Sequence, residues 1–268
     1  MQPDMVRRIL VHTGLLQGSR GPEPLPQFVQ ADGSPGRVDR HADILQSGPT
    51  VEFDAPLVVQ ISRWDRAKDM GGVMQAFAET VAPSTSAHLL LVGPSVAGVA
   101  DDPEGGEVLL ECMQQWQLLP HTVRARIHLA CLPMRDIDEN AAIVNALQRH
   151  ATVVVQKSLA EGFGLTVAEA MWKARPVVAS AVGGIQDQIV DGESGVLLHD
   201  PGDLPAFGEA VRDLLEDPVL AARLGRAAEQ RVSDLFLSDT HLEHWSNLIL
   251  TLHTAPPPIG DSSTGHIS

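Results

Sequence analysis

The stretch TVVVQKSLAEGFGLTVAEA, residues 152–170, passes from a short branched apolar run, through a loop with two glycines, into an apolar helix. The same order of apolar run, loop and amphipathic segment recurs along the chain. Strands are expected at 57–61, 88–92, 126–130, 152–155, 176–179 and 196–198. Each run is brief and rich in branched residues, which is typical of strands buried on both faces. The alternation of strands and helices therefore predicts an α/β fold with a doubly wound parallel sheet.

The same pattern divides the chain into three parts. Residues 1–54 are expected to form a short amphipathic helix and a Gly-, Pro- and Ser-rich linker, and residues 253–268 a disordered tail. Residues 55–252 are expected to form the sheet domain. Its helices are expected at 69–81, 103–116, 140–149, 165–173, 185–190, 204–215, 218–236 and 239–252.

Composition excludes several classes of function. A formal net charge of −15 argues against a nucleic-acid surface, which needs positive charge to release counterions. The two cysteines, Cys112 and Cys131, have no CxxC spacing, so neither a disulfide nor a zinc site is expected. No apolar run reaches the roughly 18 to 20 residues that span a membrane, and the first residues do not read as a secretory signal, so a cytoplasmic location is expected.

The loop SRWDRAKD, residues 62–69, follows the first expected strand and opens a helix. Arg63 and Lys68 stand on either side of its turn, so both cations could converge with free helix N–H groups on a diphosphate. The alternative is structural, with Arg63 paired to Asp65 and Lys68 in solvent. Because ligands bind at the carboxyl ends of parallel strands, the first interpretation predicts an anion site here.

The loop QKSLAEGFGLTVAE, residues 156–169, follows the fourth expected strand. Gly162 and Gly164 permit ligand oxygens to approach the backbone, and the helix beginning near Leu165 directs its N–H dipoles to the same place. Glu161 and Glu169 are spaced to bond hydroxyls at two ends of an extended ligand. The alternative is a loop whose glycines only cap and turn, and nothing fixes the carboxylate separation that a glycosidase needs.

A third loop, SAVGGI, places Gly183 and Gly184 after another strand, where their amides could bind a phosphate or sugar hydroxyl, although Gly-Gly is also an ordinary turn. Other signatures are missing. The eleven histidines form no HExxH or similar spacing, so no bound metal is expected. The absence of GxGxxG, GxSxG and GxxxxGK[ST] disfavours a nicotinamide-dependent dehydrogenase, a serine hydrolase and a P-loop hydrolase.

Three segments together resemble the family-4 retaining glycosyltransferases, of the trehalose glycosyltransferring synthase and trehalose phosphorylase type. They are VQISRWDRAKDMGGVM from Val59, VNALQRHATVVVQKSLAEGFGLTVAEAMWKARPVVASAVGGI from Val144, and DDPEG at 101–105. The resemblance covers roughly residues 55–250. It implies the C-terminal, Rossmann-like half of a GT-B fold, in which two such domains face each other across a cleft.

The resemblance also implies roles. Arg63 and Lys68 would hold the leaving diphosphate, Glu161 would bond hydroxyls of the donor sugar, and Glu169 would bond the nucleotide ribose. The other implied neighbours of the nucleotide sugar are Lys157, Gly162, Phe163, Gly164, Leu165, Gly183, Gly184 and, beside the base, a residue near Leu132. Same-face attack, in which the departing phosphate oxygen helps to deprotonate the acceptor, would retain configuration. A metal is dispensable in such a site because cationic side chains take its electrostatic role.

The implied reaction transfers glucose from a nucleoside-diphosphate glucose, with UDP or ADP as the nucleotide, to glucose, which gives trehalose without a cofactor. Residues 1–54 are too short for the N-terminal, acceptor-binding GT-B domain, so the chain alone is expected to be inactive unless it meets such a partner. The alternatives are a non-catalytic nucleotide-sugar-binding module and an isolated half of a split enzyme. The face that would meet the partner domain could also support a homodimer.

Overall fold

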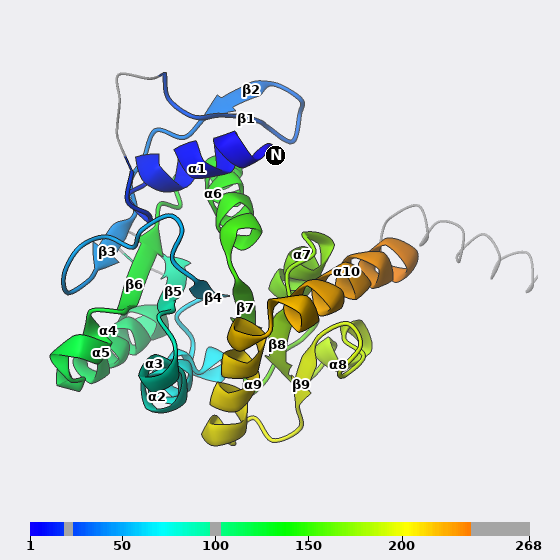
Figure 1. The fold of residues 1–268 in the computed structure, drawn as a ribbon. Helices are drawn as coiled ribbons and strands as arrows, with labels where there is room; N and C mark the ends of the chain where they lie inside the picture. Colours follow the sequence, from blue (N-terminus) through cyan, green and yellow to red (C-terminus); the bar gives the residue numbers. More distant parts are fainter. Residues whose placement is uncertain (19–23, 97–102, 237–268) are drawn as a thin grey trace, which may run out of the picture.

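The computed structural model describes residues 1–18, 24–96 and 103–236 of the chain. A seven-stranded sheet runs through it in the order β3-β6-β5-β4-β7-β8-β9 (Figure 1). The strands are β3 (Asp43–Leu45), β4 (Leu57–Ile61), β5 (His88–Pro94), β6 (Ile127–Leu132), β7 (Val153–Gln156), β8 (Val177–Ser180) and β9 (Val196–Leu198). The six expected strands, and the doubly wound sheet that they predict, are confirmed.

The order of the parallel strands places a topological switch point at the middle of the sheet. Strand β4 pairs in parallel with β5 on one side and with β7 on the other. The chain thus builds outward from β4 in one direction and then continues from β7 in the opposite direction. Ligands of open α/β sheets bind at such a switch point, so a site is expected at the carboxyl ends of β4 and β7.

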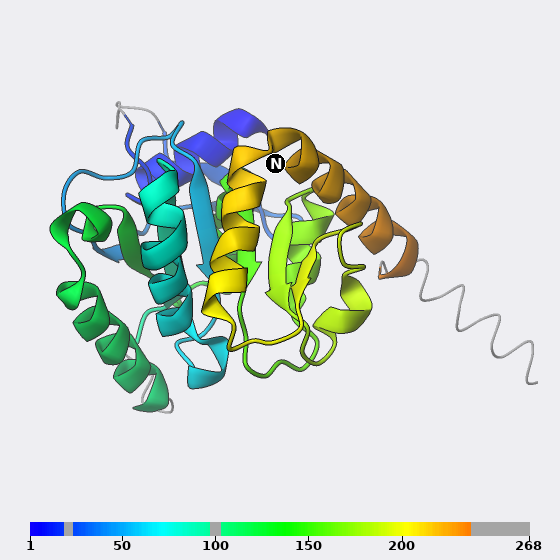
Figure 2. The same ribbon diagram turned by 60° about the horizontal axis from the view of Figure 1, so that its bottom comes forward.

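Helices cover both faces of the sheet. They are α1 (Pro3–His12), α2 (Met70–Ala76), α3 (Ala82–Ser84), α4 (Pro103–Leu118), α5 (His121–Arg124), α6 (Ile137–His150), α7 (Leu165–Trp172), α8 (Ile185–Gln188), α9 (Leu204–Glu216) and α10 (Pro218–Leu235), with a π-helical turn at Phe77–Val81. In Figure 2, the teal α2 and the gold α9 lie side by side over one face of the sheet. The blue α1 and the brown α10 lie toward the top of the view. The helix expected at 239–252 and the tail at 253–268 lie outside the described residues.

The side chains of strand β4 contribute to the hydrophobic cores on both faces of the sheet. All five of its residues are buried. Because successive side chains point to opposite faces, Val58 packs in the core beneath α2 and α9, whereas Val59 packs in the core beneath α1, α6 and α7. A strand buried on both sides reads as continuously apolar, as the sequence indicated.

Within residues 1–54, where a helix and a linker were expected, the segment after α1 is not only a linker. It contains β1 (Gln27–Val29) and β2 (Pro35–Arg37), which form an antiparallel pair, and β3, which adds to the main sheet antiparallel to β6. The buried Glu139 carboxylate on α6 accepts hydrogen bonds from the Asp39 and Arg40 amides, at 2.7 and 2.8 Å. Strands β1 to β3 are largely exposed or only partly buried and present no continuous apolar run, so tertiary contacts decide them.

Within the described part of the chain, no helix combines the length and the apolar character needed to cross a bilayer.

Candidate functional site

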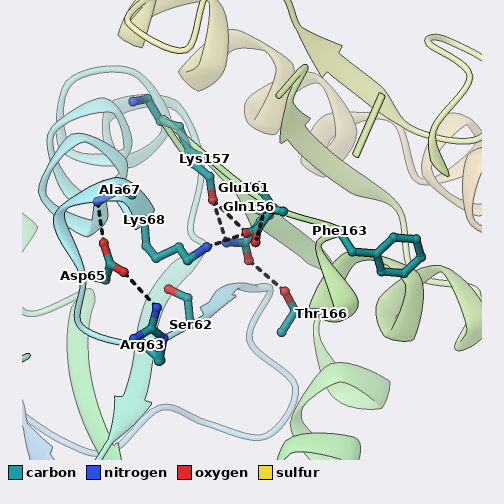
Figure 3. Close-up of polar contacts among 12 residues, drawn as sticks. Ser62, Arg63, Asp65, Ala67, Lys68, Gln156, Lys157, Glu161, Phe163 and Thr166 are labelled. Carbon is teal, nitrogen blue, oxygen red and sulfur yellow. Dashed lines mark hydrogen bonds and ion pairs between the residues drawn. The ribbon is translucent and has the colours of Figure 1, made fainter. Parts of the chain in front are cut away.

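The loops that follow β4 and β7 meet at the carboxyl edge of the sheet (Figure 3). The amide of Leu159 donates a 2.7 Å hydrogen bond to the carbonyl of Ala67, so the two loops are joined through their backbones. This junction lies at the switch point between the two strands. The two segments singled out from the sequence therefore build one site.

The centre of the site is an ion pair between the two loops. Lys68 Nζ lies 2.6 Å from Glu161 Oε2, and the side chains are only 13% and 14% exposed. Ser158 Oγ donates to the same carboxylate oxygen at 3.4 Å. Figure 3 shows Lys68 reaching across to Glu161. A lysine ammonium has three N–H donors, and this contact uses one of them.

A series of hydrogen bonds between side chains orients the Glu161 carboxylate. Thr166 Oγ1 donates to Gln156 Oε1 at 3.1 Å, and Gln156 Nε2 donates to Ser158 Oγ at 2.9 Å. Ser158 in turn donates to Glu161. Gln156 and Ser158 are both buried, so the carboxylate is supported by satisfied polar groups rather than by solvent.

Arg63 does not join this pair. Its guanidinium lies 3.1 Å from the Asp65 carboxylate, and its side chain is 68% exposed. Asp65 also accepts from the Ala67 amide at 2.8 Å, which caps the short helical turn Arg66–Lys68. The pairing of Arg63 with Asp65 that the structural alternative foresaw is present, whereas Lys68 is not in solvent. Convergence of both cations stays a prediction that needs Arg63 to turn.

The glycine-containing part of the loop that follows β7 packs closely against the Gly183–Gly184 turn. Gly164 adopts φ +87° and precedes the first residue of α7, so the helix N-terminus opens at the site. Gly183 has φ +52°, and a Cβ there would lie 1.8 Å from the carbonyl oxygen of Glu161. The Gly184 amide donates to the Gly162 carbonyl at 2.7 Å. The Gly183–Gly184 turn thus supports the loop, and the Gly184 amide is occupied rather than offered to a phosphate.

Two apolar side chains stand open beside the helix N-terminus. Leu165 is 68% and Phe163 46% exposed. Phe163 points away from Lys68 and Glu161 (Figure 3), and its ring meets that of Phe236 edge-on at 6.1 Å. Both residues lie at the carboxyl edge, so they are available to a large ligand or to a facing protein surface.

Glu169 lies on α7 and has a different environment from Glu161. Its Oε2 accepts from Gln148 Nε2 at 3.3 Å, and Lys173 Nζ donates to Gln148 Oε1 at 2.7 Å. Burial lowers the pKa of Lys173 to about 8; Arg149 acts in the same direction and Glu169 opposes it. Glu169 is exposed, as contact with a ribose requires, but this role stays a prediction.

Two of the expected ligand neighbours are turned into the protein. Lys157 is 1% exposed, and its ammonium pairs with Asp69 beneath the loop that follows β4. Leu132, 2% exposed, packs in the apolar core at the end of β6. Both side chains are therefore closed to a ligand, because their positions at strand ends point inward. At the end of β6 the exposed side chain is Met134.

Sequence reasoning missed the buried polar residues that hold this edge together. Gln60 lies inside an otherwise apolar strand, and Gln156 closes another; both are buried. A glutamine within such a run was the available signal, because a buried amide must find hydrogen-bond partners. No three His, Cys, Asp or Glu side chains gather in a metal-binding arrangement in the ranges that the structure describes.

Comparison with known proteins finds relatives of this architecture. A trehalose synthase from Pyrococcus horikoshii is 35% identical over 204 residues, which are 75% of this chain and 45% of that protein. The structure of sucrose-phosphate synthase from Thermosynechococcus elongatus is 29% identical with a TM-score of 0.58, over 77% of this chain and 47% of that one. Anabaena HepE, in complex with UDP-glucose, shares the fold at 22% identity and a TM-score of 0.60, over 74% and 49% of the two chains.

The chain spans about half the length of these relatives. The family model for glycosyl transferases group 1 matches residues 49–231, which include both loops of the site. The resemblance drawn from the motifs is confirmed. This chain belongs to the group 1 glycosyl transferases.

Proposed function

We propose that this chain binds a nucleoside-diphosphate glucose at the carboxyl edge of β4 and β7 and forms the donor side of a retaining glucosyltransferase. The observation that carries the proposal is the Lys68–Glu161 pair, 2.6 Å apart, beside the N-terminus of α7. A cation and helix N–H groups are donors suited to a diphosphate, and the neighbouring carboxylate can accept from sugar hydroxyls, which supports the proposal. The trehalose synthase relative and the UDP-glucose complex of the same fold support the choice of ligand.

The chemistry needs no protein nucleophile. As the bond between the anomeric carbon and the diphosphate oxygen breaks, negative charge develops on the diphosphate. Lys68, Arg63 once it turns from Asp65, and the α7 N–H groups would stabilise this charge, a kind of contribution worth several kcal/mol. The acceptor hydroxyl forms the new bond to the anomeric carbon, and its proton leaves with the diphosphate. Glu161 would orient the sugar.

We propose glucose as the acceptor and trehalose as the product, because of the similarity to trehalose synthase. The acceptor would bind on a second domain facing the edge where Phe163 and Leu165 are exposed. UDP-glucose and ADP-glucose are the donors to test first. If phosphate rather than a nucleotide leaves, the same cations would serve a trehalose phosphorylase.

Titration calorimetry with UDP-, ADP- and GDP-glucose tests the binding step. We expect one of them to bind, and Lys68→Ala to weaken that binding by about tenfold or more, as expected for losing a charge-assisted contact. Arg212→Ala is the matched control, because Arg212 pairs only locally with Asp213 on α9. Binding of NAD with no binding of any sugar nucleotide would overturn the proposal.

Turnover separates an enzyme half from a non-catalytic binding module. The chain is combined with a separately expressed acceptor domain of a trehalose synthase, and trehalose is assayed with the donor that binds. Trehalose formation that requires Lys68 supports the enzyme. Tight donor binding with no turnover under these conditions would favour the binding module.

A further inference from the structure

Gln60 makes contact with both loops of the site from inside the sheet. Its side chain is fully buried in β4, at 0% exposure. Its Nε2 donates to the carbonyl of Lys68 at 2.6 Å, and its Oε1 accepts from the amide of Lys157 at 3.1 Å. One amide thus satisfies an acceptor of the first loop and a donor of the second. It fixes the backbone from which the Lys68 side chain extends.

Asp69, the next residue, is held equally firmly. Its φ of +45° lies in the left-handed region, which is uncommon for non-glycine residues, although aspartate and asparagine adopt it more readily than most. Asp69 Oδ1 accepts from the Gly72 amide at 3.1 Å and caps α2, while Oδ2 pairs with the buried ammonium of Lys157. The second loop therefore contributes a cation that holds the turn immediately after Lys68.

Trp64 anchors the start of the same loop. Its ring is 1% exposed, and its Nε1 donates to the carbonyl of Pro94 at 3.0 Å. The ring lies against Gly93, where a Cβ would come within 2.4 Å of it. The loop is thus fixed at Trp64, at Lys68 and at Asp69, whereas the Arg63 side chain near its start is 68% exposed.

The loop that follows β4 is held in part by a buried lysine, Lys157. Removing an ammonium from water costs free energy that an apolar side chain of similar volume would not incur. Lys157 nevertheless lies under the site with its charge paired. Such a group is well suited to fix geometry, and preorganised donors act on developing charge without having to reorganise during the reaction.

We propose that Gln60 and the Lys157–Asp69 pair are positioning residues, which together form a clamp that sets the Lys68 ammonium beside Glu161. The clamp itself follows from the contacts of this chain. Its consequence, that Lys68 is preorganised for the diphosphate of a sugar nucleotide, rests on the proposed function.

Trace labelling with acetic anhydride tests the clamp without any ligand. Lys68, Lys157 and Lys173 are the only lysines in the sequence, so mass spectrometry can follow each of them. We expect Gln60→Leu to raise the labelling of Lys68 relative to Lys173 by about fivefold, the factor that one lost buried hydrogen bond represents. Asp69→Asn should do the same while keeping the left-handed turn, which asparagine tolerates.

Trp116→Phe is the control for general loosening. Trp116 on α4 is buried and donates to the Ile127 carbonyl at 2.7 Å, away from both loops. Its loss should leave the ratio of Lys68 to Lys173 unchanged. A ratio that also stays unchanged in Gln60→Leu and Asp69→Asn would overturn the clamp, as would an equal rise in the labelling of all three lysines.

A binding cycle with UDP-glucose tests the consequence. We expect Gln60→Leu to weaken binding about fivefold in the wild-type background and less than about twofold when Lys68 is already Met, because the effect passes through Lys68. Equal factors in both backgrounds would show a merely structural residue. If the labelling ratio changes but none of UDP-, ADP- and GDP-glucose binds, the clamp stands and the proposed function fails. If UDP-glucose binds but neither the ratio nor the cycle responds, the function stands and the clamp fails.

Discussion

The two edges of the sheet bury ionisable side chains in opposite ways. At the carboxyl edge the buried groups are charged and paired, as in Lys68 with Glu161 and Lys157 with Asp69. At the amino edge, His88 Nδ1 and His128 Nε2 lie 3.0 Å apart with their rings stacked. Burial lowers the pKa of both histidines, that of His128 to about 3.

The difference shows where this fold keeps charge. An unpaired buried charge costs several kcal/mol, so a protein either neutralises such a group or pairs it. The amino edge follows the first course, since burial of its two histidines lowers their pKa and favours the neutral form. The carboxyl edge follows the second, which retains charge at the place where a charged ligand is proposed to bind. Four variants break or sharpen this contrast.

The largest effect is expected for Gly183→Ala at the carboxyl edge. A Cβ at this position would meet the Glu161 carbonyl at 1.8 Å, and φ is +52°. We expect a loss of about 4 kcal/mol in the free energy of unfolding, measured by urea denaturation. Gly162→Ala is the control, because nothing lies within 4 Å of a Cβ there. Similar losses in the two variants would contradict the close packing of these loops.

Lys157→Met should cost about 3 kcal/mol, because it removes a buried cation and leaves Asp69 without its partner. Adding Asp69→Asn should restore part of this loss by removing the uncompensated carboxylate. Arg212→Met, which removes an exposed pair with Asp213, should leave the denaturation midpoint unchanged. If Lys157→Met were equally harmless, the paired charges of the carboxyl edge would have no structural role.

Lowering the pH should reduce the free energy of unfolding through the buried His128 at the amino edge. His128 has an ordinary pKa of 6.5 when unfolded and about 3 when folded, so between these values the unfolded state binds more protons. Its contribution is present above pH 6.5 and is lost as the pH falls toward 3, by about 2 kcal/mol at pH 5. The groups that act on this pair are Arg126, which lowers the pKa of His88, and Glu52, which raises it.

Replacement of the buried histidine isolates its share of the acid effect. In His128→Gln, the difference in the free energy of unfolding between pH 7 and pH 5 should be about 2 kcal/mol smaller than in the wild type. The carboxylates elsewhere titrate equally in both proteins and cancel in this comparison. An unchanged difference would mean that His128 is not held neutral.

The smallest effect is expected for Arg66→Gln. Arg66 pairs with Glu104, Glu107 and Glu111, but its side chain is 51% exposed. Solvent screens such contacts, so we expect the Tm to move by less than about 1 °C in a thermal scan. A larger shift in Tm would show that exposed ion pairs, and not only the buried pairs of the carboxyl edge, contribute to stability.

The sequence predicted the sheet and the edge at which Lys68 and Glu161 meet, but not the environment of each side chain. Apolar runs identified β4 to β9, and loop position placed Lys68 and Glu161 on one edge. The sequence left open whether Arg63 would pair with Asp65, and it did not show that Lys157 would turn inward. Spacing along a strand gives the edge of the sheet, whereas the direction of a long side chain depends on which partner is nearest.

The short strands β1 to β3 were missed for a related reason. These strands are mostly exposed or partly buried and so lack the apolar run that marked the other strands, and β3 forms where β6 offers it an edge. Glu139 shows the same dependence, since its partners, the Asp39 and Arg40 amides, lie about a hundred residues earlier in the chain.

By itself, then, the order of residues determined the alternation of strands and helices, the parallel sheet and the two loops at its switch point, because hydrophobic period and loop chemistry are local. Only the tertiary structure decided that Gln60 joins those loops, that Lys157 pairs with Asp69 and that Gly183 lies against Glu161. These contacts join residues from about 8 to nearly 100 positions apart. A buried polar group must find a partner somewhere, and chain folding alone determines which one is within reach.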